Sequence, residues 1–129
     1  MRLLLDTHVW LWSLREPERL SRRVRHALIA AENERWLSPV STWEALILHA
    51  KGRIRLHADP AVWLTGATAN TREAPLTHEI ALAAAQLPWR HRDPADRFLV
   101  ATAQVLGLTL VTTDERLLAL KDIATLANR

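Results

Sequence analysis

Hydrophobic and polar residues follow each other in short blocks along the chain, which predicts a mixture of strands and helices. Short, wholly apolar runs suit buried strands, whereas longer segments with apolar residues every three or four positions suit amphipathic helices. The clearest strand is LTLVTT, which is apolar and rich in β-branched residues. The predicted strands are 2–5, 35–39, 72–76, 108–113 and 123–126. The predicted helices are 7–14, 17–33, 41–52, 60–70, 77–87, 93–107 and 114–120.

The predicted strands and helices alternate from one end of the chain to the other. This alternation is typical of an α/β domain built around a parallel sheet. The chain has 129 residues, the usual length of one compact domain, so we expect residues 1–129 to form a single domain. The N-terminal segment lacks the pattern of a signal peptide, and no apolar run is long enough to span a membrane. We therefore expect a cytoplasmic protein.

Composition narrows the possible chemistry. The chain has no cysteine, which excludes disulfides, thiolate metal sites and a cysteine nucleophile. The net charge is only +3, but of the 17 basic residues just Lys51 and Lys121 are lysines. Arginine forks onto phosphate and stacks on bases, so this bias suits a nucleic-acid partner. A GC-rich genome would give the same bias whatever the function, and on composition alone that explanation is preferred.

Acidic residues recur where a predicted strand ends or the next helix begins. Asp6 ends the first strand, and Glu44 lies in the first turn of the helix after the second strand. Asp93 and Asp96 open the helix that leads into LTLVTT, and Asp114 follows that strand. In an open parallel sheet these positions share one edge, and such folds bind their ligands there. Four segments distant in sequence are therefore expected to bring carboxylates to one region.

Most of these acids can also be explained as helix caps. Asp93, followed by a proline, is a good N-cap, and Asp114 could cap the last helix. Ser41 with Glu44 matches the S-x-x-E capping box. Taken singly, each of these acids is better explained as a cap. Asp6 is the exception, since it interrupts an apolar run without a capping box, and capping does not explain why every such junction is acidic.

Gathered carboxylates imply a cation. They repel one another and stay ionised only if a positive charge neutralises them. With oxygen ligands and no cysteine, Mg²⁺ fits best and Mn²⁺ is a possible substitute. A hard ion with open positions for phosphate and water is the usual equipment of phosphodiester hydrolysis.

Three segments of the chain resemble PIN-domain ribonucleases of the VapC toxin type. They are LLLDTHVWLW near the start, STWEALILHAKGRI in the middle and HRDPADRFLVATAQVLGLTLVTTDERLL near the end. They occur in the order typical of the family and span nearly the whole chain. The resemblance implies a single PIN domain, a three-layer α/β/α fold with a short central parallel sheet flanked by helices. Relatives of this branch usually carry Phe where Ala95 stands, a departure that alters packing at the helix start and leaves the ligand set unchanged.

The resemblance also implies roles for the acids. Asp6, Glu44, Asp96 and Asp114 match the catalytic positions of the family. Asp6, Asp96 and Asp114 would ligate one or two Mg²⁺ ions, and Glu44 would complete the metal shell or orient the attacking water. Because water and not the RNA 2′-hydroxyl is then the nucleophile, the products should carry a 5′-phosphate and a 3′-hydroxyl.

Further residues are implied as supporting or RNA-contacting groups. Thr7 and Thr112 match hydroxyl positions beside the acids, and Asp93 matches an additional aspartate of this branch. Arg97 could touch the scissile phosphate or could pair with an acid, and the sequence supports both roles equally. Positive charge around the acids would hold the substrate, although any one arginine could equally be a solvated surface group. The candidate RNA-binding arginines are Arg53, Arg55, Arg90 and Arg92.

The partners implied are an RNA substrate, a small VapB-like antitoxin and a second copy in a homodimer, with no membrane. The alternative is a non-catalytic PIN-like module that binds RNA or protein, although the complete acid set argues against it. A phosphoacceptor receiver domain would need an acidic pair after the first strand, and a haloacid-dehalogenase-like phosphatase would need D-x-D where DTH stands. Trp10, Trp12 and Trp43 could stack on bases, line a groove for a partner or pack in the core.

Overall fold

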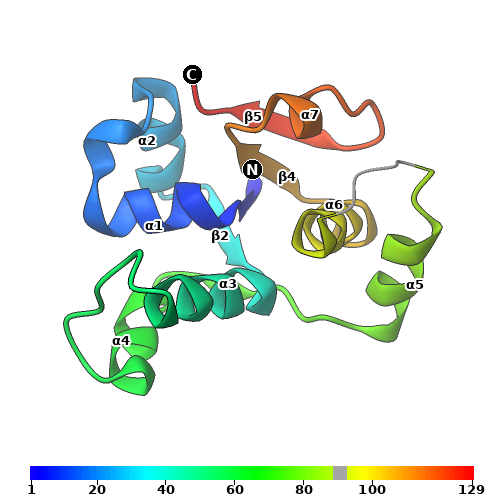
Figure 1. The fold of residues 1–129 in the computed structure, drawn as a ribbon. Coiled ribbons are helices and arrows are strands. Elements are labelled where there is room, and N and C mark those ends of the chain that lie inside the picture. Colours follow the sequence, from blue (N-terminus) through cyan, green and yellow to red (C-terminus); the bar gives the residue numbers. More distant parts are fainter. Residues whose placement is uncertain (89–92) are drawn as a thin grey trace.

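The computed structural model describes residues 1–88 and 93–129, and its centre is a five-stranded parallel sheet (Figure 1). The strands are β1 (Arg2–Leu5), β2 (Glu34–Leu37), β3 (Arg72–Glu73), β4 (Thr109–Thr112) and β5 (Ala124–Ala127). The α-helices are α1 (Thr7–Arg15), α2 (Arg22–Ile29), α3 (Pro39–Ala50), α4 (Pro60–Ala67), α5 (His78–Gln86), α6 (Pro94–Leu106) and α7 (Glu115–Leu118), and η1 (Pro17–Arg19) is a 3₁₀ turn.

The order of the strands is β3-β2-β1-β4-β5, so the first strand lies at the centre. The chain moves outward from β1 to β3 and then returns to add β4 on the other side of β1. Leu3 is paired with Arg35 of β2 on one side and with Thr109 of β4 on the other. The order thus reverses between β1 and β4, and in open α/β sheets the ligand crevice lies outside the strand ends at such a switch point.

Both faces of the sheet are covered by helices, which explains why its central strands are apolar throughout. In β1, Leu3 and Leu5 pack in a core with α1 and α2, whereas Leu4 points the other way into a core that includes Leu99 of α6. Figure 1 shows α1 to α4 on one side of the sheet and α5 to α7 on the other. The predicted three-layer α/β/α architecture is confirmed.

The predicted helix 17–33 is wrong as a single element. It is divided into η1 and α2, because Leu20 is extended and buried in the core, and Ser21 caps α2 by accepting a hydrogen bond from the Val24 amide. A serine that satisfies a free amide at a helix start stabilises the break by about 1 kcal/mol. The helix also ends at Ile29, and not near residue 33.

Helix α3 begins two residues earlier than predicted. Pro39 occupies its first turn, where the missing amide of proline costs nothing, and the Ser38 hydroxyl accepts from the Val40 amide at 3.1 Å. Strand β2 therefore ends at Leu37 and does not extend to Pro39. The shift moves Glu44 out of the first helical turn, which changes its role.

Helix α6 has the predicted start and end. The Asp93 carboxylate accepts from the Ala95 amide at 3.0 Å, Pro94 follows, and Gly107 ends the helix in the left-handed conformation with φ of 65°. With 13 residues α6 is the longest helix among the described residues. None of the helices in the part of the chain that the structure describes is long and apolar enough to cross a membrane.

Candidate active site

Asp6 lies at the switch point of the sheet, directly after β1. Its amide donates to the Val111 carbonyl of β4 at 3.0 Å, which extends the pairing of the two central strands by one residue. Its carboxylate accepts a hydrogen bond from the Thr112 hydroxyl at 2.6 Å. Asp6 occupies the N-cap position of α1 but makes no side-chain cap bond. The carboxylate is therefore oriented by β4 and is not used to cap the helix.

Glu44 is joined to the residue that follows Asp6. The buried Thr7 hydroxyl lies 2.5 Å from Glu44 Oε1 and 2.9 Å from the Ser41 hydroxyl. Because a carboxylate only accepts, the Thr7 proton goes to Glu44, and the Ser41 hydroxyl can then donate to Thr7. The capping box predicted for Ser41 and Glu44 is wrong, because Ser38 caps this helix.

The pKa of Glu44 reflects the acids that surround it. Burial raises the pKa of its carboxyl above the ordinary value, and the hydrogen bond from Thr7 opposes that rise. Repulsion from Asp93, Asp6 and Asp96 raises this pKa further. Carboxylates from β1, α3 and the start of α6 therefore act on one another, as the shared sheet edge predicts. Glu44 is half-buried among them without an arginine or lysine as a hydrogen-bond partner in residues 1–88 and 93–129.

The start of α6 brings two acids to this edge. Asp93 is the N-cap, so the capping explanation of this residue is confirmed. Asp96 lies in the first turn of the same helix, half-buried, and α6 packs directly on α3. Negative charge is favoured at this end of a helix by the partial positive charge of its free amides.

Asp114 differs from Glu44 because an arginine already neutralises it. Its carboxylate caps α7 by accepting from the Arg116 amide at 2.8 Å and also accepts from the Arg116 side chain at 2.9 and 3.2 Å. These hydrogen bonds hold the pKa of Asp114 below its ordinary value. The Thr112 hydroxyl that donates to Asp6 also accepts from the Asp114 amide at 3.1 Å, so a single threonine links both acids.

Arg97 has a structural role that the sequence did not indicate. Its guanidinium donates to the Ala84 carbonyl at 2.7 and 3.1 Å and to the Leu87 carbonyl at 3.2 Å. These carbonyls lie at the C-terminal end of α5, where a cation is favourable. The side chain thus fastens α5 to the start of α6 beside Asp96. Contact of Arg97 with a scissile phosphate stays a prediction.

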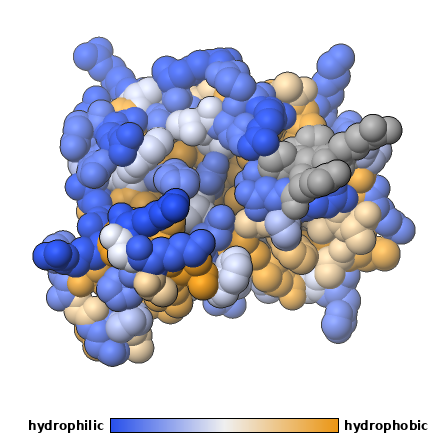
Figure 2. All heavy atoms as spheres, in the orientation of Figure 1, coloured by the Kyte–Doolittle hydropathy of each residue, from blue (hydrophilic) through white to orange (hydrophobic). Residues whose placement is uncertain are grey.

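The predicted RNA-binding arginines are not all beside the acids. A cavity of about 280 Å³ adjoins the site and is lined by Thr7, His8, Glu44 and Lys51 among others. Arg53 and Arg55 line a second, larger hollow between α1 and the end of α3. Figure 2 shows that hydrophilic side chains dominate the face over α1 and α2, whereas apolar surface gathers toward α5. The predictions for Arg90 and Arg92 lie outside the described residues.

The tryptophans divide between core and surface. Trp10 is buried, and its indole donates to the Ala67 carbonyl at 3.2 Å. The centroid of its ring lies 5.6 Å from that of Trp63, so Trp10 packs in the core. Trp12 is half-buried on α1. Trp43 is 61% exposed on α3, one residue before Glu44.

The donor set suits a hard divalent cation. The ligands available are carboxylate and hydroxyl oxygens, and the neighbouring acids raise the pKa of Glu44 beyond the effect of its burial. Among the residues that the structure describes, no three acids or histidines already lie close enough together to hold one ion. A cation bound here would have to draw the carboxylates of Asp6, Asp96 and Asp114 together, so this ligand set stays a prediction.

Ser38 and Lys51 are residues of the site region that sequence reasoning missed, and Ser41 was given the wrong role. Ser38 precedes Pro39 in the same way that Asp93 precedes Pro94, and this pattern marks the true start of α3. This pattern would have shown that Ser38 is the N-cap of α3 and that Ser41 and Glu44 do not form a capping box. No sequence pattern around Lys51 indicates a role in the site. It lines the cavity because it lies at the C-terminal end of α3.

The chain is a member of the PIN domain family, whose model matches residues 3–123. It is 37% identical over 116 residues to Ribonuclease VapC22 of Mycobacterium tuberculosis, a match that covers 89% of this chain and 88% of that protein. It also resembles VapBC2 of Rickettsia felis bound to a promoter DNA fragment, with a TM-score of 0.73, 13% identity and 98% of each chain covered. DNA-bound VapBC of Salmonella typhimurium gives a TM-score of 0.73 and 15% identity, covering 100% of this chain and 99% of that one. These structures share the fold.

Proposed function

We propose that the chain is a Mg²⁺-dependent endoribonuclease of the VapC toxin class, neutralised by a cognate antitoxin. The observation that carries this proposal is the gathering of Asp6, Glu44 and Asp96 at the switch point of the sheet, where Thr112 holds Asp6 and Thr7 holds Glu44. Such a cluster needs a cation, and the sheet edge where it lies is where ligands bind. The likeness to Ribonuclease VapC22 supports the choice of RNA as substrate.

Each side chain has a defined task in this proposal. Asp6, Asp96 and Asp114 would hold the ion, with Thr112 orienting Asp6 through its 2.6 Å hydrogen bond. Glu44, fixed by Thr7, would orient the attacking water or complete the ligand set. Partners that orient ligands in this way typically matter ten- to a hundredfold for metal affinity or activity. A bound Mg²⁺ would supply an activated water and stabilise the charge that develops on the phosphate.

Partners follow from the relatives. Similar structures were solved as VapBC complexes, and one is described as a toxin–antitoxin complex from Klebsiella pneumoniae. We therefore propose a VapB-like antitoxin for this chain. A homodimer is also proposed, and the exposed apolar side chains of Trp43, Val62 and Leu82 offer surface that such contacts would cover.

A cleavage assay tests the activity. Purified protein free of antitoxin is mixed with total RNA and with single-stranded oligonucleotides in Mg²⁺, in Mn²⁺ and in EDTA. The variants Asp6→Ala and Asp96→Ala run beside it, with Arg129→Ala as a control, since Arg129 pairs with Glu115 on the surface. We expect discrete, metal-dependent cuts with 5′-phosphate ends that both acid variants lose.

The opposite result would favour the alternative. If the wild type does not cut RNA and binds it equally well in EDTA, the metal mechanism is wrong. The chain would then be a PIN-like RNA-binding module.

A further inference from the structure

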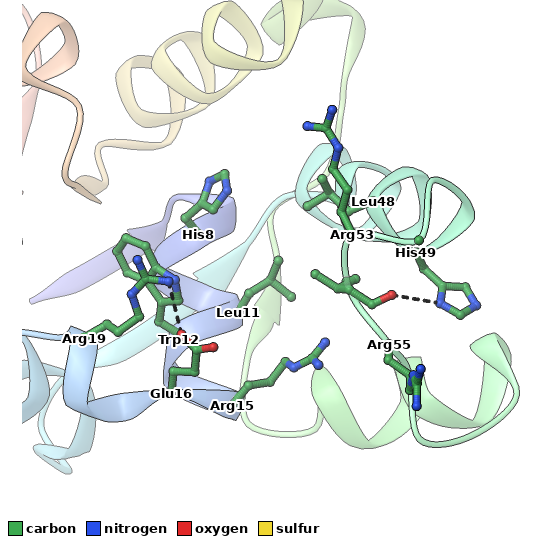
Figure 3. Close-up of a pocket in the computed structure, with 12 residues that line it drawn as sticks. His8, Leu11, Trp12, Arg15, Glu16, Arg19, Leu48, His49, Arg53 and Arg55 are labelled. Atoms are coloured by element: carbon green, nitrogen blue, oxygen red, sulfur yellow. Dashed lines mark hydrogen bonds and ion pairs between the residues drawn. The ribbon is translucent and has the colours of Figure 1, made fainter.

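A second hollow lies beside the candidate active site. It measures about 670 Å³ and is formed by α1 on one side and by the end of α3 and the segment that follows on the other (Figure 3). We call it the basic groove, because its lining includes Arg15, Arg19, Arg53 and Arg55. In Figure 3 the Arg15 side chain extends from α1 toward the segment that carries Arg55.

The positive charge of the basic groove is largely uncompensated. Arg15, Arg53 and Arg55 are exposed, and their guanidinium groups make no hydrogen bond or ion pair with residues 1–88 or 93–129. Among the described residues of the lining, Glu16 is the single acid, and it already pairs with Arg19 at 3.1 Å. Three unpaired cations around one hollow favour an anionic occupant.

The floor of the basic groove is apolar and partly aromatic. Leu11, Leu48 and Ile54 line it together with Trp12. The Arg19 guanidinium lies over the Trp12 ring at 4.6 Å, and the His8 ring lies 5.9 Å from it. An arginine-rich groove with an aromatic ring is the combination that binds single-stranded nucleic acid through phosphate contacts and stacking.

The basic groove adjoins the cavity that Glu44 lines. His8 and Leu48 line both hollows. His8 follows Thr7, the residue that binds Glu44, and Leu48 lies one helical turn after Glu44 on α3. A strand held at the acids would therefore pass over His8 directly into the basic groove.

We propose that the basic groove binds the sugar–phosphate backbone of single-stranded RNA on one side of the cleavage site. Arg15, Arg53 and Arg55 contact successive phosphates, and the Trp12 side of the groove receives a base. This inference rests on the proposed ribonuclease function and extends it to a substrate path. An acidic peptide would complement the same charges, but the shared boundary with the cavity beside Glu44 favours the strand, because the proposed cleavage site adjoins that cavity.

The test is RNA binding by the full chain in EDTA, where RNA is not cut. The triple variant Arg15→Ala/Arg53→Ala/Arg55→Ala is compared with Arg22→Ala/Arg23→Ala/Arg25→Ala, which removes the same charge from exposed positions on α2. Fluorescence anisotropy gives the affinity for single-stranded RNAs of about 4 to 16 nucleotides, the usual site sizes of such grooves. Thermal unfolding of both variants checks that each is folded.

We expect the groove variant to bind the longer RNAs about a hundredfold more weakly near 0.1 M salt, with a salt slope smaller by about 2. Both values follow from three lost phosphate contacts at ~0.7 of slope each. The α2 variant should lose only a small part of the affinity. The difference between the variants should grow with RNA length, because only longer strands reach the basic groove.

Two outcomes would overturn the proposal. One is equal RNA affinity for the groove variant and the α2 variant. The other is an unchanged RNA affinity with loss of a co-expressed antitoxin from the groove variant, which would make the basic groove a protein-docking surface. If the wild type cuts RNA and the groove variant binds RNA normally, the proposed role of the basic groove is wrong, whereas the proposed ribonuclease function is supported. If the wild type does not cut RNA but the groove variant loses RNA binding, the proposed ribonuclease function is wrong, whereas the basic groove is supported as an RNA-binding site.

Discussion

Glu44 and Asp114 lie at two ends of the same acidic edge and have opposite surroundings. Glu44 is half-buried, accepts a neutral hydroxyl and faces three other acids, so its pKa is raised. Asp114 accepts two hydrogen bonds from the Arg116 side chain, so its pKa is lowered. Both residues were predicted to serve one site, yet only one of them has a resident cation.

The difference shows how a site can be acidic without being unstable. A carboxylate that is already paired adds little repulsion, whereas the unpaired group carries the electrostatic cost that a bound ion would remove. The Glu44 end of the edge is therefore expected to depend on a divalent cation. The Asp114 end is expected to depend on Arg116. Five substitutions would break or sharpen this contrast.

The largest effect is expected at the unpaired end. Asp6→Asn should reduce Mg²⁺-dependent cleavage by more than about a hundredfold, since loss of a ligand exceeds the ten- to hundredfold typical of residues that only orient ligands. Asp114→Asn should reduce it by about tenfold, because Arg116 already occupies that carboxylate. Single-turnover rates on one oligonucleotide measure both. Equal losses would contradict the contrast between the two ends.

Thr112→Val tests the residue that links the two ends. It removes the hydroxyl that donates to Asp6 and accepts from the Asp114 amide, so we expect a loss of about 10- to 100-fold in activity. Thr102→Val is the matched control, because Thr102 is equally buried and its hydroxyl donates only to the Phe98 carbonyl among the described contacts. If both variants lose activity equally, packing and not orientation is the cause.

Arg116→Gln should make the two ends more alike. Without the guanidinium, the pKa of Asp114 should rise toward its ordinary value, and Mg²⁺ should bind about two- to fivefold more tightly, because an exposed ion pair contributes little. Carboxyl-carbon NMR titration and calorimetry measure the two changes. Arg129→Gln, which removes a surface pair with Glu115, should alter neither.

Glu44→Gln should give the smallest effect, on stability. A raised folded-state pKa means that the carboxyl contributes stability below its ordinary pKa and loses it as pH rises through the folded value. In EDTA the variant should therefore be more stable than the wild type at neutral pH, by less than about a factor of five in the folded-to-unfolded ratio. This advantage should vanish near pH 4, and Mg²⁺ should reverse it. Urea unfolding at both pH values measures the difference in stability between the variant and the wild type. A difference that is the same at both pH values would show that burial and repulsion do not act on Glu44.

The architecture could be predicted because most elements agree with local rules. The apolar run of β1 and the cap-to-glycine pattern of α6 each specify their element without help from distant residues. The break at Leu20 and Ser21 could not be foreseen, because the apolar spacing of 17–33 also suits one helix and only core packing decides. The strand β3 is two residues long and depends on pairing with β2.

The acidic edge was predicted from position alone, and its internal division was not. Strand ends place Asp6 and Asp114 near each other in any parallel sheet. The sequence does not indicate that Arg116 folds back onto Asp114, because that depends on the short α7. The sequence left two roles open for Arg97 and did not indicate its carbonyl partners at the end of α5. These hydrogen bonds form only because α5 packs on α6.

The strand order has a consequence for biosynthesis. β1 is made first, but its neighbour β4 and the threonine that orients Asp6 come 106 residues later in the chain. Chains emerge from the ribosome N-terminus first, and such distant contacts form only once both partners are available. A nascent chain that has not yet released β4 therefore has Asp6 without its partner. The acidic edge is therefore assembled only after β4 has been released, and an incomplete chain lacks it.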